Sequence, residues 1–200
     1  MAKDNISPLV RRSVAQGRGP NCYNFAPPTN TYYQLIASLV PEDARKGLDV
    51  GCFLGDFSSH LVQRGLLAEV DCVDLSPAAI EHARKRHRDP RLRFSVGDAE
   101  TYQPQGSYDV VLLMGILERF TLERVVAIMR NVHPHTRYVL VTFTEQCMRH
   151  FSVAEFYRDC RTLFRLKKQV TYTIREREAY EAGLRPQTNH HTFVLLGRVE

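Results

Sequence analysis

The sequence has no apolar run long enough to span a membrane. The longest, from Val110 to Leu117, is interrupted only by Gly115 and is well short of the roughly 20 residues that a spanning helix needs. The N-terminal residues, Met1–Asn5, lack the apolar core of a signal peptide. We therefore expect a cytoplasmic protein that does not contact membranes.

Cysteines are few and unpatterned. The five form an odd set without the paired spacing of a metal site: Cys22, Cys52, Cys72, Cys147 and Cys160. We expect reduced, mostly buried thiols and no metal ion. The sequence also lacks a zinc-binding spacing, a nucleophile elbow, a P-loop and any internal repeat.

The composition is typical of one globular domain. The chain has 200 residues, 44% of them hydrophobic and 24% charged, with a net charge of +5 and a pI of about 9.0. This charge suits an anionic partner, but the excess is modest and dispersed. The densest basic runs are Arg84–Arg88 and Arg165–Lys168. We interpret the first as a solvated helix end, where cations favour the helix dipole, with a nucleic-acid patch as the alternative.

The segment Gly47–Phe57 organises the rest of the chain. Its apolar run ends in Asp49, Gly51 and Gly55 follow, and a helical pattern begins at once. This order predicts a parallel strand, a tight turn and a helix N-terminus. Glycines allow backbone to approach a ligand closely, and the helix end offers free N–H groups.

A second predicted strand, Val70–Asp74, also ends in a carboxylate. Asp74 follows the glycine turn by about 20 residues, the spacing at which an acidic strand end meets a ribose. A carboxylate accepts hydrogen bonds from both hydroxyls of a ribose diol.

The remaining patterns predict strands alternating with helices. We expect an N-terminal arm over 1–28, partly mobile, and a single domain over 29–200. In its first half we expect a helix through Tyr32, Leu35, Ile36 and Leu39 ended by Pro41, a helix from Phe57 to near Gly65, an N-cap at Ser76 followed by Pro77, and strands at 91–96 and 108–114.

In its second half we expect a helix with Leu122, Val125, Val126 and Met129 on one face, followed by a strand at 138–143. A capping box at Ser152–Glu155 then begins a helix that buries Val153, Phe156, Tyr157, Cys160 and Phe164. Two strands, at 169–174 and 192–196, close the chain and are joined by the polar loop 175–191.

This order predicts the fold class: an α/β, doubly wound, seven-stranded sheet. It is mostly parallel, with a C-terminal antiparallel hairpin strand and helices on both faces, because two closing strands without a helix between them indicate an antiparallel pair. Ligands bind such sheets at the carboxyl ends of the strands, near the switch point. The segments that meet there are Asp49–Gly55, Asp74, Asp98 and Met114–Glu118.

The acids at this edge suggest the ligand. Gly97-Asp98-Ala99 offers a carboxylate to an exocyclic amine and a backbone N–H to a ring nitrogen, a pairing that describes adenine. Asp49 lies near the glycine turn, where a pyrophosphate binder would avoid negative charge. A ligand that carries an ammonium or sulfonium group suits Asp49 better.

These segments together resemble the class I S-adenosylmethionine-dependent methyltransferase superfamily. Over roughly residues 30 to 200 the order and spacing match, with the first motif at Leu48–Gly55, the acidic second-strand motif at Val73–Ser76, the adenine-binding turn at Gly97–Glu100 and the post-strand-four motif at Met114–Phe120. The resemblance implies S-adenosyl-L-methionine as the cofactor. It implies cofactor contacts at Asp49, Gly51, Cys52, Gly55, Asp74, Leu75, Asp98, Ala99 and Met114.

Two residues depart from the family pattern. Phe53 stands where the family usually has a glycine, which would crowd the loop and weaken cofactor binding. Arg119 stands where many members have histidine, which removes one potential proton acceptor. The remaining candidates for a general base are Glu118, which holds either the loop or the acceptor, and His150 in the loop after the fifth strand.

The sequence also bears on three other functions. A nicotinamide dehydrogenase is disfavoured because Phe53 and Asp56 occupy the second and third glycine positions of its G-x-G-x-x-G turn. An RNA methyltransferase is compatible with the charge, but small-RNA methylases of this fold use Glu and His after strand four, and Glu118 is followed by Arg119. A protein that binds the cofactor without catalysis is compatible with Phe53.

The sequence therefore predicts methyl transfer to an oxygen or nitrogen atom of a small-molecule acceptor. The arm, the loop after the fifth strand and the 175–191 loop would form the acceptor pocket. The acceptor and the oligomeric state are left open. Holding donor and acceptor in line can supply on the order of 7–11 kcal/mol, to which a base adds roughly 10²–10⁴-fold where the acceptor must lose a proton.

Overall fold

The computed structural model describes residues 31–144, 148–174 and 189–200. The predicted N-terminal arm lies outside the described residues, as does most of the predicted 175–191 loop.

Strands and helices alternate along most of the described chain, but among the described residues no helix separates the third strand from the fourth. In order, the elements are α2 (Thr31–Ala37), β1 (Lys46–Val50), α3 (Asp56–Gln63), β2 (Glu69–Asp74), α4 (Pro77–Arg86), β3 (Leu92–Val96), β4 (Tyr108–Met114), the 3₁₀ turn η1 (Leu117–Arg119), α5 (Leu122–Val132), the 3₁₀ turn η2 (His133–His135), β5 (Thr136–Thr144), α6 (Val153–Cys160), β6 (Phe164–Ile174) and β7 (Asn189–Arg198).

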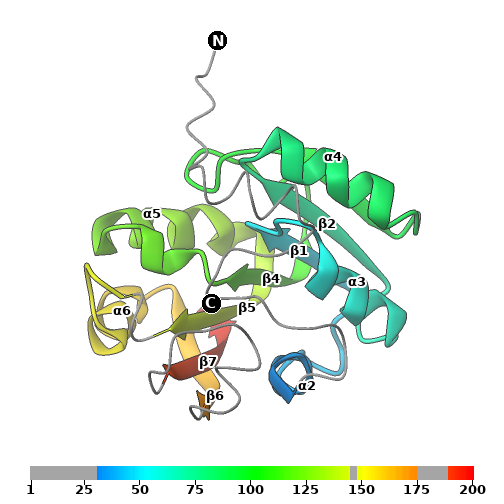
Figure 1. Cartoon of the computed structure of the whole chain (residues 1–200). Coiled ribbons are helices and arrows are strands. Elements are labelled where there is room, and N and C mark those ends of the chain that lie inside the picture. The colour runs from blue at the N-terminus through cyan, green and yellow to red at the C-terminus, as the bar shows by residue number, and fades with distance from the viewer. Residues whose placement is uncertain (1–30, 145–147, 175–188) are drawn as a thin grey trace.

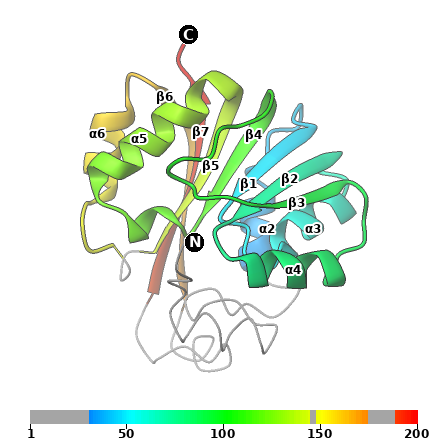
Figure 2. The same cartoon turned by 90° about the horizontal axis from the view of Figure 1, so that it is seen from above.

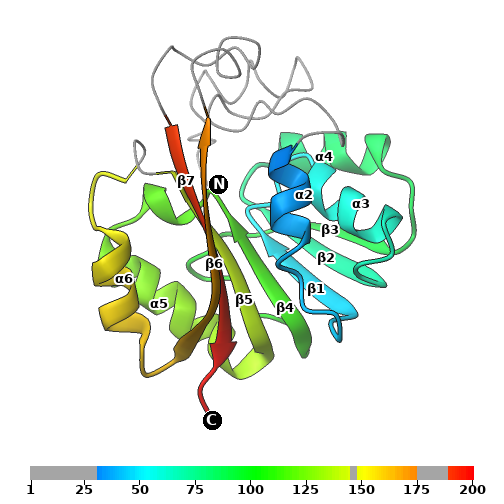
Figure 3. The same ribbon diagram turned by 90° about the horizontal axis from the view of Figure 1, so that it is seen from below.

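The seven strands form one sheet in the order β3-β2-β1-β4-β5-β7-β6 (Figure 1). Neighbours from β3 to β5 pair in parallel, whereas β7 is antiparallel to both β5 and β6. Helices α2, α3 and α4 cover one face, and α5 and α6 cover the other (Figures 2 and 3). The predicted fold class is therefore confirmed.

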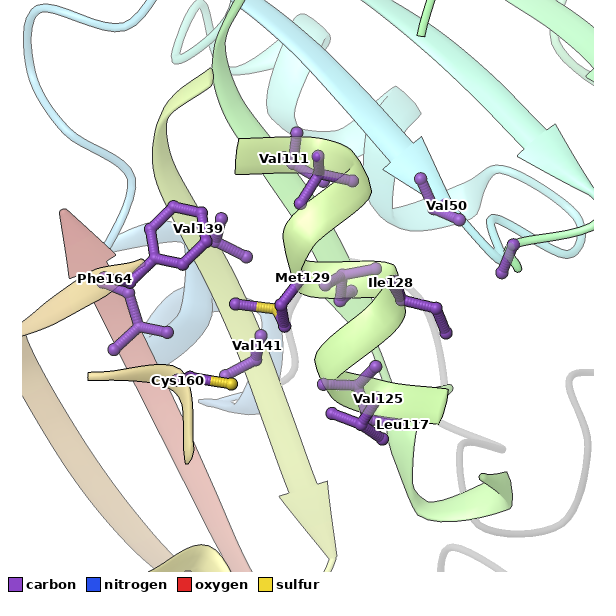
Figure 4. Close-up of a cluster of buried hydrophobic side chains, with 14 of the residues drawn as sticks. Val50, Val111, Leu117, Val125, Ile128, Met129, Val139, Val141, Cys160 and Phe164 are labelled. Carbon is purple, nitrogen blue, oxygen red and sulfur yellow. The ribbon is translucent and has the colours of Figure 1, made fainter. Parts of the chain in front are cut away.

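Each face buries its own apolar cluster because side chains alternate across the pleated strands. On β1, Leu48 and Val50 belong to the cluster under α5 and α6, whereas Val70 and Cys72 of β2 belong to the one under α2, α3 and α4. Figure 4 shows the former, in which α5 lays its apolar stripe across β4 and β5. Each fully buried Val, Leu, Ile or Met contributes roughly 1.5–3 kcal/mol, so these clusters supply most of the driving force.

Several element boundaries differ from those expected. Helix α5 buries Val125, Ile128, Met129 and Val132, so its stripe lies further along the chain than the predicted one from Leu122. Phe164 was predicted in the last helix but begins β6, because α6 ends at Cys160 and a turn follows. Its ring still enters the core, edge-on to His133.

The outer hairpin is longer than the sequence indicated. β6 begins five residues before the predicted start at Gln169 and includes the charged run Arg165–Lys168. Its side chains are exposed on an edge strand, where charge prevents pairing with other sheets.

Helix α2 ends at Ala37, earlier than Pro41 suggested.

None of the helices in the described part of the chain is long and apolar enough to cross a membrane.

β1 lies between β2 and β4. Successive strands up to β3 are added on one side of β1 and those from β4 on the other side, so the strand order reverses beside β1. This switch point is where an open α/β sheet leaves a crevice at its carboxyl edge. The turns that follow β1, β2, β3 and β4 meet there and define the candidate site.

Candidate functional site

The turn after β1 has a backbone that only glycine fits at two positions. Gly51 has φ 83° and Gly55 φ 72°, both in the left-handed region. A Cβ at Gly51 would lie 2.6 Å from Ile116, and one at Gly55 would lie 2.5 Å from the Phe94 ring. The predicted glycine turn therefore packs directly against the segments after β4 and on β3.

Backbone hydrogen bonds join this turn to the end of β2. The amides of Gly51 and Cys52 both donate to the Val73 carbonyl, at 2.7 and 3.0 Å. Cys52 is half-buried, and its thiol contacts Cys72. That contact, and then burial, raise the pKa of the Cys52 thiol, so it stays protonated.

Phe53 also takes a left-handed conformation, with φ 51°, which is unusual for a bulky residue. Its amide donates to Asp74 Oδ2 at 2.8 Å, and its ring packs beside Leu54 and Ala79 at the start of α4. A strained residue of this kind costs on the order of 1–3 kcal/mol and persists because its surroundings fix it. Phe53 thus adopts a left-handed backbone at a position where the family that the sequence resembles usually has glycine.

Replacing Phe53 with glycine tests whether its side chain crowds the loop. The backbone already has a glycine-like conformation, and the Asp74 contact is a backbone one. We therefore expect little change in affinity for S-adenosylhomocysteine, the demethylated product of the cofactor that the sequence resemblance implies: its Kd should change by no more than about threefold. Isothermal calorimetry on both proteins measures this. A Kd more than tenfold tighter in Phe53→Gly would instead support the predicted crowding.

Asp74 ends β2 with both carboxylate oxygens held by backbone amides. Oδ2 accepts from Phe53 N and Oδ1 from Ser76 N at 2.9 Å. A carboxylate has about four acceptor positions, so two stay available to a diol. Burial raises the pKa of Asp74, while the two amides and the positive charge of Arg119 lower it.

Asp49, at the end of β1, is 2% exposed and accepts a hydrogen bond of 2.5 Å from Ser58 Oγ on α3. Burial raises its pKa to about 7, the Ser58 hydrogen bond opposes that rise, and the negative charge of Asp74 adds to it. No cationic side chain among the described residues pairs with Asp49. A buried carboxyl of this kind that ionises near neutral pH is typical of a binding site for a cation.

The turn after β3 lies beside the end of β2. Gly97 N donates to the Asp74 carbonyl, and Asp98 Oδ1 accepts from Glu100 N, both at 3.0 Å. Ala99 is buried among the α5-side cluster. Next to this turn, Leu75 and Val96 are 64% and 51% exposed, which places two large apolar side chains in solvent at the same edge.

The segment after β4 completes the site. Met114, half-buried at the strand end, is followed by Gly115, whose amide donates to Thr142 Oγ1 at 2.8 Å. Glu118 is 6% exposed, and its Oε1 accepts from Thr144 N at 2.9 Å. Both threonines belong to β5, so this segment is attached to the neighbouring strand at two points.

The two other residues singled out after β4 and β5 lie at the surface. Arg119 is exposed, and its charge acts on Asp74. His150 is exposed in the segment before α6, and no contact in the described residues joins it to the carboxylates above. Across the described residues, no group of three or more His, Cys, Asp or Glu side chains converges as a metal site would require.

Sequence reasoning missed four polar residues that structure the site: Ser58, Thr142, Thr144 and His191. Thr144 Oγ1 lies 3.2 Å from His191 Nδ1 on β7, and burial, with the charge of His190, lowers the pKa of His191 to about 4. A signal for the threonines existed, since Thr142 and Thr144 are polar residues two apart in an otherwise apolar strand. The partners of Ser58 and His191 depend on tertiary pairing.

A family model described as a methyltransferase domain matches residues 48–138. Among curated proteins, the chain is 40% identical over 65 residues to the malonyl-[acyl-carrier protein] O-methyltransferase 1 of Ilyobacter polytropus, covering 32% of this chain and 24% of that protein. It is 37% identical over 107 residues to the mitochondrial ubiquinone biosynthesis O-methyltransferase of Schizosaccharomyces pombe, covering 50% and 38%. The chain thus spans well under half the length of these relatives.

Among solved structures, the N-methyltransferase NodS of Bradyrhizobium japonicum, in complex with S-adenosyl-L-homocysteine, has a TM-score of 0.76 to this chain. The match covers 96% of this chain and 97% of that one at 13% identity, so it concerns the fold.

Proposed function

The chain belongs to the class I S-adenosylmethionine-dependent methyltransferase superfamily, and on this premise we propose that it transfers a methyl group from S-adenosyl-L-methionine to an oxygen or nitrogen atom of a small molecule. The observation that carries the proposal is the meeting of Asp49 and Asp74 around a turn of left-handed backbone. Phe53 N and Ser76 N orient the Asp74 carboxylate.

The residues present fit this cofactor. Asp74 has acceptor positions left for the ribose hydroxyls, and Asp49 suits the ammonium of the methionine part. The exposed Leu75 and Val96 are suited to cover an adenine, with Asp98 and Ala99 at the same turn. When bound, the cofactor supplies a methyl group on a sulfonium, a good leaving group.

The role of the protein is to hold the donor in line with the acceptor and to exclude water. Such positioning can lower the activation barrier by on the order of 7–11 kcal/mol. Gly51 and Gly55 allow the backbone to lie close to the methionine part, together with Cys52 and the Met114 backbone. Both curated relatives described above are O-methyltransferases, which supports an oxygen acceptor.

The basic run Arg84–Arg88, which begins in the last turn of α4, favours the small molecule over RNA. Three of its cations are engaged within the chain: Arg84 donates to the Phe94 carbonyl, Lys85 pairs with Glu81 and Arg86 pairs with Asp56. These contacts support the interpretation of the run as a helix end. The cytoplasmic location and the single domain over 29–200 stay predictions from the sequence.

The experiment is to measure S-adenosylhomocysteine release with three acceptor sets: small carboxylic acids, phenols and amines, alongside bulk transfer RNA. We expect release that requires one small-molecule class and disappears in Asp74→Ala. Turnover with transfer RNA alone would contradict the proposal and identify the protein as an RNA methyltransferase. Cofactor binding without turnover on any acceptor would favour a binding protein without catalysis.

A further inference from the structure

A second group of buried polar residues lies beside the cofactor candidates. We name Glu118, Thr142, Thr144 and His191 the β5 polar cluster. Their exposed fractions are 6%, 0%, 3% and 1%, so all four are buried. Buried polar groups are retained where hydrogen bonds satisfy them, so their contacts indicate what they hold.

The contacts of the β5 polar cluster fix one segment at both ends. Gly115 N donates to Thr142 Oγ1 at the start of residues 115–118, and Thr144 N donates to Glu118 Oε1 at the end. His191 extends the cluster to β7 through Thr144, and the register pairs these two residues. The hydrogen bonds to β5 thus fix the position of residues 115–118 at the carboxyl edge of the sheet.

The fastened segment forms a wall of the glycine turn. Ile116 comes so close to Gly51 that a Cβ there would lie 2.6 Å from its Cδ1. Next to it, Leu117 is fully buried in the cluster under α5 (Figure 4). A shift of residues 115–118 would therefore move Ile116 against the turn and the Met114 backbone beside it.

We propose that Thr142 and Glu118 are positioning residues for the cofactor, which fasten residues 115–118 to β5 and thereby set the wall of the glycine turn. This inference rests on the proposed function. It assigns Glu118 to the loop rather than to proton abstraction, since its Oε1 accepts a backbone hydrogen bond that an amide oxygen can also accept.

Two matched pairs of variants test the proposal. Thr142→Val keeps the shape of the side chain but removes the acceptor for Gly115 N, whereas Thr142→Ser keeps it. Glu118→Leu removes the acceptor for Thr144 N, whereas Glu118→Gln keeps it. We expect the Kd for S-adenosylhomocysteine to rise about tenfold in Thr142→Val and Glu118→Leu and to stay within about threefold in Thr142→Ser and Glu118→Gln.

A cofactor-free measurement separates this proposal from the proposed function. In the apoprotein, amide hydrogen exchange at Gly115 should accelerate at least tenfold in Thr142→Val, and exchange at Thr144 should accelerate likewise in Glu118→Leu, with wild-type rates in Thr142→Ser and Glu118→Gln. If wild type binds no S-adenosylhomocysteine while this pattern holds, the proposed function fails and the fastening stands.

Two outcomes overturn the inference. One is an unchanged Kd in Thr142→Val together with faster exchange at Gly115, because the segment would then be loosened without consequence for the cofactor. The other is wild-type cofactor affinity in Glu118→Gln with turnover lost more than 100-fold, the result expected of a general base.

Discussion

Replacing Asp74 with alanine should weaken the binding of S-adenosylhomocysteine by at least about 100-fold. The variant removes the acceptor for two ribose hydroxyls, and hydrogen bonds to a charged group contribute about 1.5–3 kcal/mol each. It also removes the acceptor for Phe53 N and Ser76 N, which shape the turn after β1. Calorimetric titration of wild type and Asp74→Ala measures the loss.

Asp71→Asn provides the matched control on the same strand. Asp71 lies three residues earlier and contacts Arg93 and Tyr108 rather than the glycine turn. We expect Asp71→Asn to lower the melting temperature and leave the Kd unchanged. Equal losses of affinity in the two variants would mean that Asp74 acts through general stability, and its assignment to the ribose would be wrong.

Replacing Asp49 with asparagine should have opposite effects on stability and on affinity. Asparagine keeps an oxygen for Ser58 Oγ but carries no charge. The Kd for S-adenosylhomocysteine should rise about 10- to 100-fold, because the ligand ammonium loses its carboxylate. The apoprotein should become more stable at pH 8, since a buried charge is removed.

The direction of this stability change follows from the raised pKa of Asp49. The folded state holds the proton up to about pH 7, whereas the unfolded state releases it near 3.8. The stabilisation from protonated Asp49 is therefore fully present below about pH 4 and lost as the pH rises through 7. At pH 8 this loss amounts to about 4 kcal/mol, which Asp49→Asn should recover in chemical denaturation. A variant less stable than wild type at pH 8 would contradict a buried charge that lacks a cationic partner among the described residues.

The same ionisation should make ligand binding depend on pH. Wild type should bind S-adenosylhomocysteine about tenfold more tightly at pH 8 than at pH 6, because only ionised Asp49 pairs with the ammonium. 5′-Methylthioadenosine, which lacks the amino acid part, should show little pH dependence, as should Asp49→Asn with either ligand.

Much of the fold could be predicted because local signals agreed with tertiary structure. The near-continuous apolar run Tyr108–Met114, interrupted by Asp109, is β4 to the residue, since a central parallel strand is covered on both faces. Ser76 with Pro77, and Ser152 with Glu155, begin α4 and α6 as their capping chemistry indicates. Local chemistry decides these features, so no distant contact was needed.

Other features depend on partners far away in the sequence. The helical spacing of Leu122 and Val126 was as regular as that of the residues α5 buries, and only packing on β4 and β5 selects the stripe. Phe164 has the spacing of a helical core residue, but it enters the core from a strand.

The candidate site shows the same division. Asp49, Asp74 and the glycines could be found because strand ends and turns mark them in the sequence. The attachment of residues 115–118 could not, since its partners Thr142 and Thr144 lie on β5, which only the pairing of β4 with β5 brings beside this segment. Phe53 has the left-handed backbone that a glycine would adopt. That its side chain crowds the loop stays a prediction, which Phe53→Gly tests.

The central claim is that the carboxyl edge of β1, β2 and β4 holds S-adenosylmethionine. The most direct measurement is calorimetric titration of S-adenosylhomocysteine into the wild-type protein at pH 8, with folding verified by circular dichroism. We predict a single site with a Kd of about 1 μM or tighter. A folded sample that produces no binding heat at any temperature tested, and no ligand-induced rise in melting temperature, would contradict the account.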